Sequence, residues 1–329
     1  MKNLIICCLL LLIASTGTAA TSAQLSPIDT DHRHQANNVK VTILSTMLAD
    51  SGIGEWGFAA LVEVDGKRVL FDTGARPETV LHNAEELNID LSEVTDVVLS
   101  HFHDDHTAGL ITLRKAMMVK NPAALSRVQV GAGIFEPRYI KDGAEDVNSM
   151  GLIRQQYEAT GGVFIVHANA EQILPGVLLT GPVERRYDEQ NWDKEYWVAG
   201  AGGRVDDTIR EDMSMIINTP QGMIVITGCG HAGIANILNS AQKLLPGTKV
   251  HAVIGGLHLY AADEKKLVWT AEKMRASGVQ YLLAAHCTGL EATYRLRTLL
   301  RLTRKTAVVA AVGSSYSSLT GIDPLDLAR

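Results

Sequence analysis

The chain carries, at residues 101–109, the stretch His101-Phe102-His103-Asp104-Asp105-His106-Thr107-Ala108-Gly109, directly after the mainly apolar run 97–100. Such a run is typical of a short buried strand. A strand that ends in His-x-His-x-Asp-His brings imidazole and carboxylate groups to one point at the edge of a sheet. Zinc and other borderline metals bind nitrogen and oxygen donors of this kind, so the spacing predicts a site for one or two ions. A polar loop that is rich in histidine by chance is the alternative, and the spacing disfavours it.

Five stretches of the chain together resemble the metallo-β-lactamase superfamily. More closely, they resemble the branch named for dihydropterin-ribofuranosyl-aminobenzene-phosphate synthase. They follow one another in the order that the family has, and they span nearly all of the chain after residue 23. The stretches are Phe71-Asp72-Thr73-Gly74-Ala75, residues 101–109, residues 226–234, residues 254–259 and His286-Cys287-Thr288-Gly289.

The order of the elements points to an α/β fold. Strands are followed by helices, and hairpins open each half, which argues for two mixed β-sheets packed face to face with helices outside. This is the αββα sandwich that the resemblance also implies, with the metals along one edge where the sheets meet. Helices are expected at residues 77–87, 110–120, 150–160, 234–245, 262–277 and 291–305. Strands are expected at residues 39–47, 58–64, 68–71, 95–100, 128–130, 163–166, 213–218, 223–227, 250–254, 281–285 and 307–312.

Two sets of metal ligands are expected, in which His231 is our candidate for the third imidazole of the first ion. They are His101, His103 and His231 for a first ion, and Asp105, His106 and His286 for a second. Cys229 stands where many members of the family have a bridging Asp, and its thiol can bind a soft metal as a thiolate. The histidine that usually precedes this loop is absent from residues 206–212, so a single ion is the alternative to two.

Three further residues lie at the ends of expected strands. In the family, Asp72 braces the metal loop from behind, where a carboxylate that fixes an imidazole improves it as a ligand; a simple turn residue is the alternative. His258 follows two glycines at a strand end and is expected to be a proton donor or substrate ligand, or else a structural histidine. His251 begins the same strand, so we expect it to lie outside the site.

Residues 1–23 have the features of a secretory signal peptide. Lys2 is a short charged region, residues 4–13 are apolar, and residues 14–23 are rich in small residues. The apolar part is too short for a comfortable membrane span. Its two cysteines lie within it and not after it, which disfavours a lipid anchor. We therefore expect a periplasmic or secreted protein without a stable membrane anchor.

The rest of the chain is expected to be a flexible lead-in at residues 24–38 and a single domain at residues 39–329. The formal net charge of −6 argues against non-specific binding of nucleic acid. Beyond residue 23 the cysteines are Cys229 and Cys287. Each stands beside a predicted site histidine, so a role in the site competes with a disulfide between them.

Residues 121–210 are expected to be an insertion that serves the substrate. The segments 136–139 and 181–186 carry arginines, which are natural partners for phosphate or carboxylate, although arginines on surface loops are more often only solvated. The segment 188–197 contains two Trp and one Tyr and is a candidate lid or edge over the cleft. For Trp56, in a glycine-bearing loop, contact with substrate and packing in the core are both open.

These ligands predict a hydrolase of a small-molecule substrate. A bound zinc ion, with manganese or iron as alternatives, lowers the pKa of water and polarises a carbonyl or phosphoryl oxygen. Asp105 is placed to orient the attacking water, and no serine or cysteine nucleophile is required. Hydrolysis of an ester, phosphoester, lactone or lactam is the leading interpretation. A pterin-related synthase and a non-catalytic, metal-dependent binding protein are the alternatives, and the sequence leaves the oligomeric state open.

Overall fold

The computed structural model describes residues 34–326 of the chain. The predicted signal peptide, and residues 24–33 of the predicted lead-in, lie outside the described residues. Between residues 34 and 326, no helix is both long enough and apolar enough to cross a bilayer.

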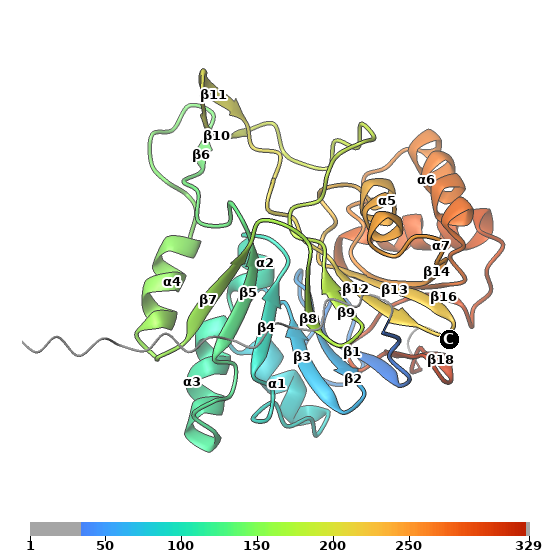
Figure 1. Cartoon of the computed structure of the whole chain (residues 1–329), viewed down its shortest axis with the longest axis horizontal. Helices are drawn as coiled ribbons and strands as arrows, with labels where there is room; N and C mark the ends of the chain where they lie inside the picture. Colours follow the sequence, from blue (N-terminus) through green and yellow to red (C-terminus); the bar gives the residue numbers. More distant parts are fainter. Residues whose placement is uncertain (1–33, 327–329) are drawn as a thin grey trace, which may run out of the picture. The chain divides into compact units, whose positions relative to one another are not determined.

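Eight strands form the first sheet, in the order β18-β17-β1-β2-β3-β4-β5-β7 (Figure 1). Asp65 and Gly66 join β2 to β3 with positive φ angles of 47° and 82°, as the predicted tight turn requires. Strands β3, β4, β5 and β7 are parallel, so their carboxyl ends lie at one edge. The strands are β1 (Val39–Ser45), β2 (Ala59–Val64), β3 (Lys67–Phe71), β4 (Asp96–Leu99), β5 (Arg127–Gly131), β7 (Val163–His167), β17 (Ser315–Ser317) and β18 (Gly321–Asp323).

Seven strands form the second large sheet, in the order β16-β15-β14-β13-β12-β9-β8. Strands β13 to β16 are parallel, and β12 pairs antiparallel with both β13 and β9. The carboxyl ends of β13, β14 and β15 therefore meet at one edge. The strands are β8 (Glu171–Leu174), β9 (Val177–Leu179), β12 (Met215–Thr219), β13 (Gly222–Thr227), β14 (Val250–Gly255), β15 (Tyr281–Ala284) and β16 (Ala307–Val309).

Apolar packing stacks these sheets and helices in four layers (Figure 1). One buried cluster joins the two sheets and includes Ile43 and Ile226, and the neighbouring Leu44 turns to the opposite face of its sheet. Because helices cover the outer faces, the central strands are apolar on both sides. This confirms the predicted αββα sandwich. The helices are α1 (Thr79–Glu86), α3 (Leu110–Lys120) and α4 (Met150–Glu158) on the first sheet, and α5 (Ile234–Leu244), α6 (Glu264–Ser277) and α7 (Leu290–Leu299) on the second.

The structure differs from the sequence prediction mainly where strands are short. The last expected helix ends at Leu299 and the last expected strand at Val309, and the chain then returns to the first sheet as β17 and β18. A separate three-stranded sheet of β6 (Tyr139–Ile140), β10 (Tyr196–Gly200) and β11 (Gly203–Asp206) was not expected at all. These strands have two to five residues, too few for a periodic pattern to identify them.

Candidate metal centre

The stretch 101–109 leaves the sheet at the carboxyl end of β4, as predicted. The short helix α2 (Asp104–Thr107) begins directly after His103, and His101 and His106 are fully buried. The Nε2 atom of His101 lies 2.9 Å from Nδ1 of His103. The rings of His101 and His106 lie 4.3 Å apart, centre to centre. The loop therefore gathers all three imidazoles at the sheet edge.

Asp72 holds this loop from behind. Its buried carboxylate accepts hydrogen bonds of 2.7 Å from the backbone N–H and the hydroxyl of Ser100, and it lies 2.7 Å from Nδ1 of His106. With Nδ1 donating to Asp72, the Nε2 atom of His106, which lies beside Sγ of Cys229, can bind a metal in place of a proton. The backbone of Asp72 lies in the left-handed region, with φ of 56°. These contacts favour the predicted bracing role over that of a simple turn residue.

The second sheet supplies the other predicted ligands from three separate strand ends. Cys229 and His231 follow β13, His258 follows β14, and His286 follows β15. A Cβ atom on Gly228 would lie 2.0 Å from Oγ of Ser100, so only glycine lets the loop after β13 approach the loop after β4 this closely. Residues more than 120 positions apart thereby become neighbours.

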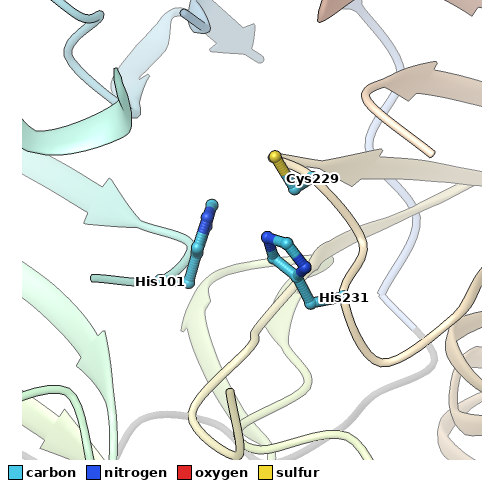
Figure 2. Close-up of side chains that lie close together, drawn as sticks. All are labelled: His101, Cys229 and His231. Carbon is cyan, nitrogen blue, oxygen red and sulfur yellow. The ribbon is translucent and has the colours of Figure 1, made fainter. Parts of the chain in front are cut away.

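The two groups of residues converge on one space. The ring of His231 lies 4.7 Å from that of His101 and 4.9 Å from that of His103, and the ring of His286 lies 5.0 Å from that of His106. Sγ of Cys229 lies 3.1 Å from Nε2 of His106. Figure 2 shows His101, Cys229 and His231 turned toward one another. Three donor sets with all ligand atoms within 4.8 Å of one another are His101–Cys229–His231, His106–Cys229–His286 and His101–His103–Asp105.

Unpaired buried nitrogens show that these donors fit a metal. The Nε2 atom of His231 and the Nδ1 atom of His286 are buried without a hydrogen-bond partner in the described part of the chain. A buried polar atom without a partner costs about 1–3 kcal/mol, a cost that metal coordination would remove. The Nδ1 atom of His231 contacts the carbonyl oxygen of Asn191, which directs Nε2 inward. Imidazole, carboxylate and thiol donors in this arrangement suit zinc.

The electrostatics of the centre follow from burial and from the neighbouring charges. Burial, with help from the neighbouring imidazoles, holds the pKa of His101 and that of His231 well below the ordinary value. Burial also lowers the pKa of His103, to about 3. For His106, burial acts to lower the pKa, but the carboxylates of Asp105 and Asp72 outweigh it and raise the pKa to about 9. Three neutral imidazoles are thus available as metal ligands.

Asp105 faces the same space from the other side of the loop. One carboxylate oxygen lies 3.8 Å from Nε2 of His106, and the other lies 3.3 Å from Nε2 of His286. Burial acts to raise the pKa of Asp105, but the neighbouring His106 and His286 lower it by more than burial raises it. The pKa of Asp105 therefore falls below the ordinary value. The side chain is 23% exposed, which leaves the carboxylate accessible to a substrate or to water.

Two contacts that the sequence did not indicate position the loop of His231. The buried carboxylate of Asp212 accepts a 2.8 Å hydrogen bond from the N–H of Ala232, and burial raises the pKa of Asp212 to about 6. The carbonyl of Asn191 fixes the imidazole of His231, as described above. Asp212 lies in the segment where the usual upstream histidine is missing. The sequence showed only that Asp212 is an acidic residue directly before an expected strand, and it did not indicate the contact with Ala232.

The arginine segments of the predicted insertion make internal contacts. Arg138 is buried, pairs with Asp207 at 2.8 Å and with Glu211 at 2.6 Å, and lies over the ring of Phe102 at 3.9 Å. Arg185 donates a 2.8 Å hydrogen bond to the carbonyl of His231. Both guanidinium groups therefore fasten the insertion to the metal loops, and neither is free to bind a substrate phosphate.

A cavity of about 240 Å³ opens beside the donors. Its lining joins the metal loops to the insertion and consists of Phe102, His103, Asp193, Tyr196, Asp207, Ile209, His231, His258 and Tyr260. Trp56 is 48% exposed, and its ring lies 4.9 Å from that of His286 and 5.6 Å from that of Tyr260. Of the two roles open for Trp56, packing in the core is therefore wrong. The segment 188–197 contributes Asp193 and Tyr196 to the wall of this cavity.

Two predicted histidines fall in different places. His258 lines the cavity and its ring lies 4.6 Å from that of His231, with backbone φ of 50°. His251 lies at the opposite end of β14, where its ring packs on those of Tyr281 and Tyr316. The prediction that His251 lies outside the site is confirmed.

The chain is similar in sequence and in fold to known proteins. A family model described as "Metallo-beta-lactamase superfamily" matches residues 57–286. The 7,8-dihydropterin-6-methyl-4-(beta-D-ribofuranosyl)-aminobenzene-5'-phosphate synthase of Methanocaldococcus jannaschii is 29% identical over 272 residues, which cover 78% of this chain and 90% of the relative. The solved structure of Tm1679, described as a metal-dependent hydrolase of the beta-lactamase superfamily, is similar with a TM-score of 0.64 and 26% identity, covering 80% of this chain and 94% of that one. The YhfI protein of Bacillus subtilis shares the fold, with a TM-score of 0.53 and 13% identity over 86% of this chain and 100% of its own.

Proposed function

Because the chain belongs to the metallo-β-lactamase superfamily, we propose that it is a metal-dependent hydrolase of a small-molecule ester, phosphoester, lactone or lactam. One observation carries the proposal: imidazoles from the stretch 101–109 converge with His231 and His286, and Nε2 of His231 and Nδ1 of His286 are buried without a hydrogen-bond partner among the described residues. His101, His103 and His231 would hold a first zinc ion, and Asp105, His106 and His286 a second. Cys229 lies between the two sets.

The chemistry then divides between the metal and this chain's own residues. When bound, zinc lowers the pKa of water and polarises the carbonyl or phosphoryl oxygen of the substrate. Asp72 holds the imidazole of His106 in place, and the partly exposed carboxylate of Asp105 accepts a hydrogen bond from the attacking water and orients it. His258, on the cavity wall, donates a proton to the leaving group.

Metal analysis combined with a substrate panel tests this proposal. Purified protein is expected to hold two zinc ions per chain and to hydrolyse at least one member of a panel of esters, phosphodiesters, lactones and nitrocefin. Removal of the metal with a chelator should abolish turnover, and added zinc should restore it. Protein that keeps two tightly bound ions but hydrolyses no member of the panel would contradict the hydrolase proposal. One loosely held ion without turnover would favour the non-catalytic binding protein.

A pterin-related synthase is the second candidate function. It rests on the relative from Methanocaldococcus jannaschii, which aligns over 90% of its length. Because Arg138 and Arg185 are held by internal contacts, a substrate phosphate would need another cationic partner, and Arg186 is the exposed arginine of the two arginine segments. Incubation with a dihydropterin that carries a diphosphate leaving group on its 6-methylene carbon, together with a ribofuranosyl-aminobenzene phosphate, decides the matter: formation of the condensed product with release of diphosphate would favour the synthase.

We also propose that the protein is exported, with loss of the segment 1–23. This proposal rests on the sequence alone. N-terminal sequencing of the protein from its native host should find a chain that begins after Ala20 or Ala23. A chain that still begins at Met1 would contradict it.

A further inference from the structure

Two buried thiols meet beside the proposed hydrolytic centre. Cys229 follows β13 and Cys287 follows β15, and their exposed fractions are 3% and 1%. Both are free cysteines, and Sγ of Cys287 lies 3.7 Å from the carbonyl oxygen of Cys229. The functional proposal uses Cys229 only as the neighbour of the histidines, and it does not use Cys287 at all.

A third donor brings an imidazole to this pair. The ligand atoms of Cys229, Cys287 and His258 all lie within 4.8 Å of one another. The Nδ1 atom of His258 is buried and has no hydrogen-bond partner in the part of the chain that the structure describes. The backbone of His258 is left-handed, a conformation that costs a non-glycine residue free energy and is retained mainly where the surrounding structure or function requires it.

The backbone between the strands leaves no room for a side chain near these thiols. A Cβ atom on Gly256 would lie 2.8 Å from Sγ of Cys287 and 2.2 Å from the carbonyl oxygen of Gly228. Glycine at this position therefore lets the two cysteine loops approach each other. The close approach is built into the fold and does not depend on flexible side chains.

We propose that Cys229, Cys287 and His258 form a site for a soft metal ion, with two sulfur donors and one nitrogen donor. Thiolates bind zinc as well as Cu(I), but a second sulfur donor favours the softer Cu(I) more than the histidine-rich neighbouring sets do. When the ion binds, the two thiol protons pass to water and both sulfurs coordinate as thiolates. The site shares Cys229 with two of the other donor sets and takes the imidazole of His258, the proposed proton donor, so a soft ion bound here would interfere with hydrolysis.

Anaerobic titration of the reduced, full-length protein with Cu(I), against a competing Cu(I) chelator, tests the proposal. The wild type is expected to withhold one Cu(I) per chain from the chelator. Cys287→Ser should weaken this binding by about a hundredfold or more, beyond the loss that follows removal of an outer partner of a metal ligand. His103→Ala is the matched control, because it removes a ligand of the first zinc set and leaves the sulfur site intact. A wild type that does not compete, or a Cys287→Ser variant that binds as well as the wild type, would overturn the proposal.

A second measurement needs no variant. X-ray absorption of the wild type loaded with one equivalent of Cu(I) should show two sulfur neighbours and one nitrogen neighbour. One sulfur with two nitrogens would overturn the proposal, since it would place the ion among the histidines with Cys229 alone. Zinc content and turnover are measured separately, so failure of this proposal and failure of the hydrolase proposal give different results.

Discussion

The two halves of the candidate centre are built in different ways. In the first half, a single loop after β4 supplies His101, His103, Asp105 and His106, and Asp72 braces it with three contacts of 2.7 Å. In the second half, the donors come from three separate loops at the ends of parallel strands, and sulfur replaces oxygen among them. In the first half, the donors are neighbours in the sequence. The second half acquires them only when β13, β14 and β15 align, so its geometry depends on the sheet.

The largest expected effect tests whether the carboxylate of the first half takes part in the chemistry. Asp105→Ala should lower kcat/KM of the active hydrolase by about a thousandfold, the scale of losing a group that stabilises the transition state. Steady-state kinetics on the best substrate of the panel measures this. Asp104→Ala is the matched control, since Asp104 is the exposed neighbour whose carboxylate contacts Ser149. If Asp105→Ala is as active as Asp104→Ala and the wild type, Asp105 is needed neither to hold metal nor to orient water.

The next effect tests whether the first half can bind metal without the second. His231→Ala should lower the affinity for the more tightly bound zinc ion by about a hundredfold or more, because the first set then loses one of three imidazoles. Zinc content after dialysis, together with circular dichroism to confirm folding, measures this. His251→Ala, at the far end of β14, should keep its full zinc content. If His231→Ala also keeps it, the loop of residues 101–109 is sufficient by itself.

A third prediction compares the two buried carboxylates that hold the metal loops, Asp72 in the first half and Asp212 in the second. Asp72→Asn should weaken zinc binding by about 10- to 100-fold, because the amide replaces a carboxylate that accepts hydrogen bonds from Ser100 and His106. Asp212→Asn should have a smaller effect, since its oxygen can still accept the hydrogen bond from Ala232. Zinc affinity, measured by competition with a chelator, should therefore fall more for the first variant. The reverse order would mean that the second half limits metal binding.

The same contrast explains what the sequence could predict. The loop of residues 101–109 contains its candidate ligands within six consecutive residues, so a local motif identifies them. The apolar runs before and after it predict β4 and α3 within one residue at each end. Family resemblance was needed to connect His231 and His286 with this loop, because no local pattern shows that strand ends 120 or more residues apart will meet. The roles of Asn191, Asp212 and Ser100 were not predictable, since each acts through one polar contact across the fold. Strands β17 and β18 were missed because three-residue segments give no periodic signal.

The last prediction concerns stability and not activity or metal affinity, at the buried contact between Arg138 and Glu211. Burial raises the pKa of Glu211 to about 7, although its partner Arg138 acts to lower it. A carboxyl group whose folded pKa lies above its unfolded value of 4.5 stabilises the fold most when it is protonated. This contribution is fully present below about pH 4.5 and is lost as the pH rises through about 7, to a total of about 3 kcal/mol at most.

Urea unfolding between these pH values should therefore show a steeper fall in stability for the wild type than for Glu211→Gln. Glutamine keeps an oxygen for Arg138 but does not titrate, which removes this part of the pH dependence. Glu136→Gln is the control, because Glu136 is exposed and pairs with the exposed Arg210. Its pH dependence should match that of the wild type. If Glu211→Gln also follows the wild type, the folded pKa of Glu211 is not raised, and its buried pair with Arg138 is fully charged at neutral pH.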